Sequence, residues 1–446
     1  MDDAHISELH ALAAELGVPG YRLMRRSELL DAVREAGGER DVDSVARSEQ
    51  KEKRRGDELP NERRPSEDRR GGGRGTCERQ GARRGRERER AHEAEEEVDA
   101  LDAEPVSGVL DILPQRYGFL RLKGLESADG DVYISASQIR RCELRPGDEV
   151  SGPAREPRRG ERHRALVHVD KVNGEDPSED GRGEFDELTP VPPTRRLPLE
   201  SVDGDEGVLV RAADLLAPLA YGQRVLVATT PGGGRTTLLR GLASALDSAE
   251  GPELIVLLID ERPEEATRWR RAFPESRLAI ATAEMSGAEQ GQVADLALAR
   301  AKRIAESGAD AVLIADSLSR LVAARGRLDA AKALFGAGRE IEEESAGSLT
   351  VIATVFEDDE VADAIATTES ALIALDPELA AEGVVPAIDA ARSRVSGEED
   401  LRQGDELDAG RRLRSELADL DPRDAATKLR ELIDGSKTNA ELLEKL

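Results

Sequence analysis

The chain has 446 residues, enough for two or three domains, and its 92 acidic against 64 basic side chains give a formal net charge of -28. This charge excludes indiscriminate binding to polyanions, although an acidic, arginine-rich composition can also reflect genome bias or a salty cytoplasm. The two cysteines, Cys77 and Cys142, have no ligand-type spacing, which excludes a disulfide framework and a zinc site. No apolar run approaches the roughly 18 residues of a membrane span. Because the N-terminus also lacks the basic and apolar regions of a signal peptide, we expect a cytoplasmic protein without a membrane partner.

The first hundred residues divide into a helical and a charged segment. Apolar side chains recur at helical spacing twice within residues 1–36, which predicts a pair of short helices. Residues 37–99 carry almost no large apolar side chains, so they cannot bury enough surface to fold and are predicted to form a disordered, arginine-rich linker. Basic residues outnumber acidic ones between Lys51 and Arg90. The linker therefore either holds RNA weakly or is a plain solvated connection.

Residues 105–174 alternate apolar and polar side chains in short segments, with Gly, Pro and Asp at the breaks. Several strands at this spacing predict a small antiparallel β-barrel. Within "RYGFLRL", Tyr117, Phe119 and Arg121 occupy every second position and therefore share one face of a strand. Tyr133 can join them from a neighbouring strand.

Three aromatic rings beside an arginine predict a stacking platform for single-stranded bases. The alternative is an ordinary aromatic core pair. Gly118 and Arg121 favour the platform, because they suit an exposed face better than a core.

A proline- and acid-rich linker at 175–195 precedes a different pattern over 196–446. Four apolar runs of strand length alternate there with helical stretches: "QRVLVATT", "LIVLLID", "AVLIAD" and "SLTVIATVF". Near-continuous apolar strands are typical of a parallel sheet that is covered on both faces. The fold class of this part is therefore α/β.

The first of these strands runs into "ATTPGGGRTTLLR", a phosphate-loop pattern in which Arg235 stands where the pattern has lysine. The loop offers backbone N–H groups and a helix N-terminus for phosphates, and Thr236 and Asp316 are the candidate Mg²⁺ residues. Glu261, after "LIVLLID", is the candidate for polarising the attacking water. The predicted nucleotide-binding residues of the loop are Pro231, Gly232, Gly233, Gly234, Arg235, Thr236 and Thr237.

Blocks along nearly the whole chain resemble, in order, the bacterial transcription termination factor Rho family. These blocks include "GVLDILPQRYGFLR", "DVYISASQIRR", "LLIDERPEE", "FGAGREIEEESAGSLTVIAT", "VPAIDAARS" and "GSKTNAELL". The resemblance implies a hexameric, RNA-dependent ATPase and 5′ to 3′ helicase that uses ATP and Mg²⁺, with RNA polymerase as a possible partner. It also implies that the barrel has the cold-shock-like oligonucleotide-binding fold and that the α/β part is a RecA-like P-loop motor. The RNA-binding residues that it implies are Tyr117, Phe119, Arg121, Asp131, Tyr133, Glu161 and His163, the last in place of a family tyrosine.

The motor departs from the family pattern at several positions. Arginine is larger and planar, so Arg235 is not a conservative replacement for the loop lysine. The resemblance also implies that Val385 is a nucleotide-binding residue, where it replaces an adenine-stacking phenylalanine. Ser396 stands where the family has an arginine finger, which contributes roughly 10³ to 10⁵ in rate. Arg394 is a substitute candidate for the finger.

The expected RNA channel is also altered. No Lys, Arg or His occurs from Glu340 through Ala391, where the family has a lysine-bearing loop that grips RNA. Carboxylates would repel phosphate there, unless Lys332, Arg320 or Arg327 takes over the grip.

Two hypotheses remain open. The chain is a working motor that pulls RNA through a ring, or it is a Rho-derived protein that holds RNA or assembles with related subunits without productive hydrolysis. The substitutions fall together at the loop lysine, the adenine-stacking phenylalanine, the arginine finger and the RNA channel. We therefore expect reduced motor activity.

Overall fold

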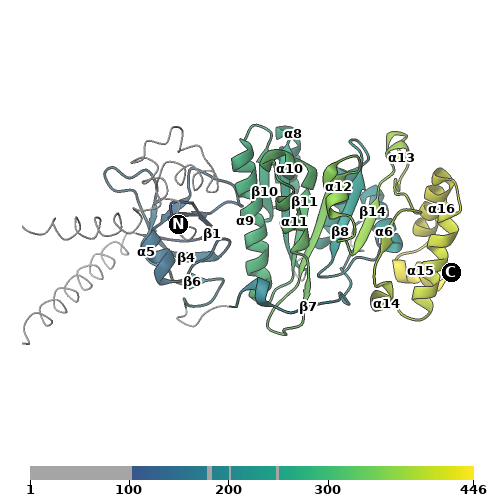
Figure 1. The fold of residues 1–446 in the computed structure, drawn as a ribbon, viewed down its shortest axis with the longest axis horizontal. Coiled ribbons are helices and arrows are strands. Elements are labelled where there is room, and N and C mark those ends of the chain that lie inside the picture. The colour runs from purple at the N-terminus through teal and green to yellow at the C-terminus, as the bar shows by residue number, and fades with distance from the viewer. Residues whose placement is uncertain (1–102, 178–182, 200–201, 248–250) are drawn as a thin grey trace, which may run out of the picture. The chain divides into compact units, whose positions relative to one another are not determined.

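The computed structural model describes residues 103–177, 183–199, 202–247 and 251–446, and Figure 1 shows their elements. The helical pair and the charged linker expected over residues 1–99 lie outside the described residues. Within them, no helix is both long and apolar enough to cross a membrane.

Six short strands form the barrel. The sheet order is β1-β2-β3-β5-β4-β6, and β1 also pairs with β4, so that the sheet closes on itself. All pairings are antiparallel except that between β3 and β5. The interior holds aliphatic side chains such as Leu110, Leu120 and Ile134, which are fully buried. The elements are β1 (Glu104–Ile112), β2 (Gly118–Arg121), β3 (Val132–Ile134), α5 (Ala136–Arg141), β4 (Glu149–Arg155), β5 (Ala165–Leu166) and β6 (Lys171–Val172).

A seven-stranded sheet forms the centre of the second part, in the order β10-β9-β11-β13-β8-β14-β15. Every pairing is parallel except the one between β14 and the edge strand β15. The predicted α/β class and its four apolar strands are confirmed. The strands are β8 (Arg224–Thr229), β9 (Glu253–Glu261), β10 (Leu278–Thr282), β11 (Ala311–Asp316), β13 (Leu349–Phe356), β14 (Ala371–Ala374) and β15 (Arg394–Val395).

Both faces of this sheet are covered, because successive strand residues point to opposite sides. Val225 and Val227 of β8 pack with one set of helices, whereas Leu226 and Ala228 pack with the other set. The first set is α6 (Gly204–Leu216), α7 (Arg235–Leu246), α8 (Pro263–Ala272), α15 (Asp405–Ala418), α16 (Pro422–Asp434) and α17 (Asn439–Glu444). The second set is α9 (Gly287–Glu306), α10 (Leu318–Arg325), α11 (Leu328–Gly336) and α12 (Glu360–Ile365).

Smaller elements complete the described part of the chain. They are the two-stranded pair β7 (Pro190–Val191) and β12 (Glu340–Ile341), the helices α13 (Pro377–Ala381) and α14 (Glu398–Leu401), and the 3-10 turns Phe185–Glu187 and Glu275–Arg277.

The strand order determines where a ligand site can form. β8, β9 and β11 all run in the same direction and end at one edge of the sheet. In open α/β sheets, ligands bind at the carboxyl ends of such strands. Thr229, Glu261 and Asp316 are the last residues of these three strands and therefore share that edge.

Candidate RNA-binding and nucleotide-binding sites

The barrel gathers four rings on one face. Phe119 of β2 lies directly across from Tyr133 of β3. The Tyr117 ring lies 5.6 Å from that of Tyr133, and the His163 ring lies 5.0 Å from that of Phe119, measured between centroids. The three Phe and Tyr rings are half-buried and His163 is exposed. The arrangement offers aromatic faces and edges to the bases of a single strand.

Arg121 is buried, contrary to the expectation from the sequence. Its side chain is 8% exposed, and its Nη atoms donate to the carboxylates of Asp111 and Asp131. Gly118 is buried too, and a Cβ atom there would lie 2.6 Å from the Asp111 carbonyl oxygen. The expectation that Gly118 and Arg121 suit an exposed face is therefore wrong.

The buried arginine still contacts the platform. Its guanidinium carbon lies 5.8 Å from the centroid of the Phe119 ring. Asp131, which is 3% exposed, pairs with Arg121 and also accepts a hydrogen bond from the Ala128 amide at 2.9 Å. These two RNA-site candidates thus lie against the rings or in the turn beside them, with their charges paired inside the protein.

Glu161 is bound by an arginine and by a backbone amide. Both of its carboxylate oxygens accept hydrogen bonds from Arg155, at 2.7 and 2.9 Å, and the Arg158 amide donates to it at 2.9 Å. These bonds to Arg155 and the Arg158 amide lower the pKa of Glu161 to about 2. Glu161 therefore ties together residues 155–161, and His163 follows two residues later.

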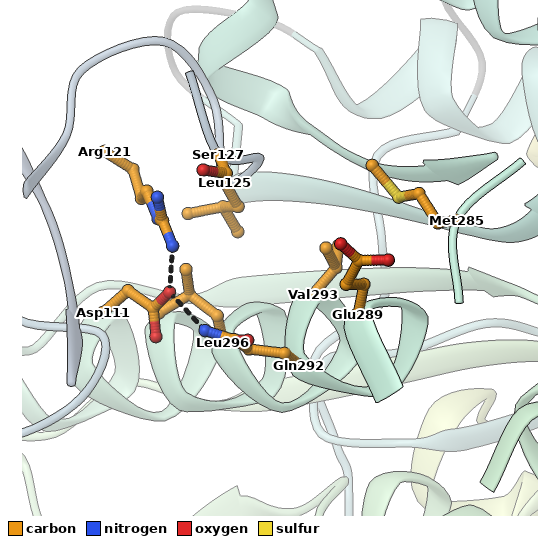
Figure 2. A pocket seen from close by; sticks show the side chains of 9 residues that line it. All are labelled: Asp111, Arg121, Leu125, Ser127, Met285, Glu289, Gln292, Val293 and Leu296. Carbon is orange, nitrogen blue, oxygen red and sulfur yellow. Dashed lines mark hydrogen bonds and ion pairs between the residues drawn. The ribbon is translucent and has the colours of Figure 1, made fainter. Parts of the chain in front are cut away.

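A small cavity of about 80 Å³ lies next to Arg121 and is lined by residues of the barrel, of helix α9 and, at Met285, of the turn before that helix. Figure 2 shows Asp111 between Arg121 and Gln292, and the Gln292 amide nitrogen donates to Asp111 at 2.8 Å. The Asp111 carboxylate thus accepts hydrogen bonds from Arg121 of the barrel and from Gln292 of α9. Neither Asp111 nor Gln292 is identified by a sequence motif, because nothing in a one-dimensional pattern pairs residues 181 positions apart.

The phosphate loop joins β8 to α7 and has the backbone that the pattern requires. Gly232 and Gly234 have φ angles of 89° and 86°, which favour glycine. A Cβ atom on Gly233 would lie 2.2 Å from the Thr229 hydroxyl oxygen, so this glycine allows a close approach. Helix α7 begins at Arg235 with Gly234 as its N-cap. The first amides of α7 can therefore bind an anion, and Thr236 and Thr237 lie in its first turn.

Arg235 is bound to Asp316. Its Nε atom donates to both carboxylate oxygens, at 3.0 and 3.1 Å. The side chains of Arg235 and Asp316 are 13% and 3% exposed. The Thr354 hydroxyl also donates to Asp316 at 2.8 Å, and the Arg235 guanidinium carbon lies 5.1 Å from the Phe356 ring centroid.

This pairing bears on the expected Mg²⁺ site at Thr236 and Asp316. A bound Mg²⁺ needs near-octahedral oxygen ligands at close range. Here the Asp316 carboxylate already neutralises a guanidinium and accepts from Thr354, so the residues do not fit Mg²⁺ in this arrangement. Among the residues that the structure describes, no group of three His, Cys, Asp or Glu side chains is placed to hold a metal ion.

Glu261, the candidate for orienting water, ends β9 and is 6% exposed. Arg320 donates to one of its oxygens at 2.8 Å, and the Arg262 amide donates to the other at 2.9 Å. The carboxylate is therefore fixed in place at the same edge as the phosphate loop. Because Arg320 is engaged by Glu261, it is a poor candidate for gripping RNA in a channel.

The other departures from the family pattern lie at the surface or at the rim of the core. Val385 is half-buried and packs against the larger core cluster. Ser396 is exposed, and its amide donates to the Ser370 carbonyl at 2.8 Å. Arg394 is 61% exposed and pairs with Glu369 at 2.7 Å.

The two remaining channel candidates are exposed. Lys332 is exposed on α11. Arg327 is 70% exposed and pairs with Asp329. Both side chains are therefore accessible to solvent.

The fold and these two sites define a class of protein: a single-strand-binding barrel followed by a RecA-like domain with a phosphate loop. Three family models match the chain. They are the Rho termination factor N-terminal domain at residues 3–41, the Rho termination factor RNA-binding domain at 106–178, and the ATP synthase alpha/beta family nucleotide-binding domain at 210–333.

Curated relatives agree with these models. Transcription termination factor Rho of Streptomyces lividans is 39% identical over 370 residues, which cover 76% of this chain and 51% of the relative. The Rho factors of Rhodopirellula baltica and Bacillus subtilis are 37% and 38% identical, and the matches cover 70% and 84% of their lengths and 75% and 76% of this chain. The chain belongs to the transcription termination factor Rho family, although it spans only about half the length of the Streptomyces relative.

A solved ATPase from a bacterial type III secretion system is a more distant neighbour. It is 21% identical with a TM-score of 0.48, and the match covers 63% of this chain and 93% of that one.

Proposed function

We propose that this chain is a Rho-type, RNA-dependent ATPase that binds single-stranded RNA on the barrel and ATP at the phosphate loop, with reduced hydrolysis. In this function it assembles into a hexameric ring and acts on transcribing RNA polymerase. The observation that carries the reduced hydrolysis is the pair of hydrogen bonds from Arg235 Nε to Asp316.

RNA binding follows from the aromatic face of the barrel. The rings of Tyr117, Phe119 and Tyr133 lie within 6.1 Å of one another, and His163 extends the group at Phe119. Stacking on such rings contributes about 1–3 kcal/mol per base and tolerates any sequence. With a net charge of -28, the chain must obtain its RNA affinity from this local stacking more than from long-range attraction.

Nucleotide binding follows from the loop between β8 and α7. The left-handed glycines Gly232 and Gly234 present backbone N–H groups at the start of α7, where the helix dipole favours an anion. These features do not depend on the residue at position 235. Nucleotide binding is therefore expected to survive the replacement of lysine by Arg235.

Hydrolysis depends on the side chains around the loop. A cation must stabilise the charge that develops on the transferred phosphoryl group. The Arg235 charge is instead paired with the buried Asp316 carboxylate. Glu261 remains fixed at the end of β9 and can still orient a water molecule. The pairing of Arg235 therefore lowers turnover, whereas the carboxylate that orients water is kept.

The test is a steady-state ATPase assay on the purified chain with and without cytosine-rich RNA. We expect slow turnover that RNA stimulates and that Glu261→Gln abolishes. Turnover that is insensitive to RNA and to Glu261→Gln would contradict the proposal. Complete absence of turnover would favour the second candidate function, an RNA-holding ring subunit that does not hydrolyse ATP, for which the Arg235–Asp316 pair is the supporting observation.

A further inference from the structure

We propose that the Arg235 guanidinium takes the position of the divalent cation, so that this phosphate loop binds nucleoside di- and triphosphates without Mg²⁺. The inference rests on the nucleotide binding proposed above and specifies the form of the ligand, a metal-free polyphosphate.

The first argument is the position of the charge. Arg235 is the first residue of α7 and directly follows the loop glycines. Its Nε atom is held by both oxygens of Asp316, the strand-end carboxylate of β11. A Mg²⁺ ion in a phosphate-loop protein links such a carboxylate to the phosphate oxygens. The Arg235 guanidinium already makes the contact to the carboxylate, and the contact to phosphate remains open to a ligand.

The second argument is the supply of donors. A guanidinium has five N–H groups in a planar fork, and Nε uses one of them on Asp316. Among the described residues, neither Nη atom of Arg235 donates a hydrogen bond to a protein acceptor. The side chain is 13% exposed rather than fully enclosed, so its free edge can reach a ligand. Planar pairs of N–H groups match phosphate oxygens in geometry and charge.

The third argument is that the position is held on several sides. Phe356 is the last residue of β13, and its ring centroid lies 5.1 Å from the Arg235 guanidinium carbon. Thr354, two residues earlier on the same strand, donates to the Asp316 oxygen that Arg235 also contacts. Mg²⁺ could enter only by displacing the guanidinium from a carboxylate that is 3% exposed, and Mg²⁺ gives up its own water reluctantly.

The experiment measures the dissociation constant of ADP for the full-length wild-type chain by calorimetry, in excess EDTA and in excess Mg²⁺. We expect the two constants to agree within about twofold, since no metal takes part. A loss of affinity of about tenfold or more in EDTA overturns the inference. Failure to bind ADP in either condition rejects the nucleotide binding of the proposed function as well, so the two failures are distinguishable.

Two variants sharpen this measurement. Arg235→Lys replaces the fork by a compact ammonium that cannot bridge in the same way, and we expect ADP binding to become at least about fivefold tighter with Mg²⁺ than with EDTA. Arg240→Lys is the matched control, because Arg240 lies on the same helix and pairs with Glu206 at the surface. As in the wild type, the dissociation constant of ADP for Arg240→Lys should be the same in EDTA and in Mg²⁺. Equal metal dependence in both variants would contradict a specific role for Arg235.

Discussion

Arg235 Nε lies 3.0 and 3.1 Å from the two carboxylate oxygens of Asp316, so the cation of the phosphate loop and the carboxylate at the end of β11 neutralise each other. The two residues are 81 positions apart in the chain. Their contact joins the residue that departs from the family pattern to a residue that matches it. The substitution therefore changes the cation site as well as the phosphate loop.

This contact also predicts a change in stability. Arg235→Ala leaves the Asp316 carboxylate buried without its cation, which should lower the free energy of unfolding by about 3 kcal/mol. Trp269, the chain's one tryptophan, is buried in α8, so its fluorescence reports unfolding of this domain in urea. Arg240→Ala, which breaks a half-exposed pair with Glu206, should cost less than about 1 kcal/mol. Equal costs for the two variants would contradict the burial argument.

The aromatic platform predicts losses of RNA affinity. Phe119→Ala and Tyr133→Ala should each weaken binding of cytosine-rich, single-stranded RNA by about 1–3 kcal/mol, roughly 5- to 150-fold. Filter binding measures the effect. Phe119→Tyr keeps a ring at this position and should remain within about threefold of the wild type. Unchanged affinity in both alanine variants would show that RNA binds elsewhere.

Glu161 predicts a pH dependence. Folding lowers the pKa of this carboxyl from 4.5 to about 2, so its bonds to Arg155 and Arg158 stabilise the protein above pH 4.5. The stabilisation is lost as the pH falls towards 2. The difference in melting temperature between the wild type and Glu161→Gln should therefore be constant at neutral pH and shrink below pH 4.5. It should be small, because the Glu161 side chain is 40% exposed. An unchanged difference at pH 3 would contradict this assignment.

Much of the fold could be predicted from the sequence, because it follows from local patterns. Alternating and continuous apolar runs identified the barrel and the parallel sheet, and the glycine pattern identified the loop before α7. The every-second-residue spacing of Tyr117 and Phe119 placed them together, and the register then brought Tyr133 across from Phe119.

The partners of charged side chains could not be predicted in the same way. The pattern placed Arg121 on the platform strand but could not show that Asp111 and Asp131 bury it. It placed Arg235 in the loop but gave no sign that the side chain turns to Asp316. Such pairs depend on tertiary packing between strands, and a single sequence carries no signal for them.

The most direct test of the central claim is the ATP turnover of Arg235→Lys relative to the wild type, at saturating RNA, ATP and Mg²⁺. A lysine releases Asp316 from the guanidinium fork and supplies the compact charge of the usual phosphate loop. The account predicts that Arg235→Lys hydrolyses ATP at least about tenfold faster than the wild type. A rate equal to or below that of the wild type would contradict the claim that the Arg235–Asp316 pair limits hydrolysis.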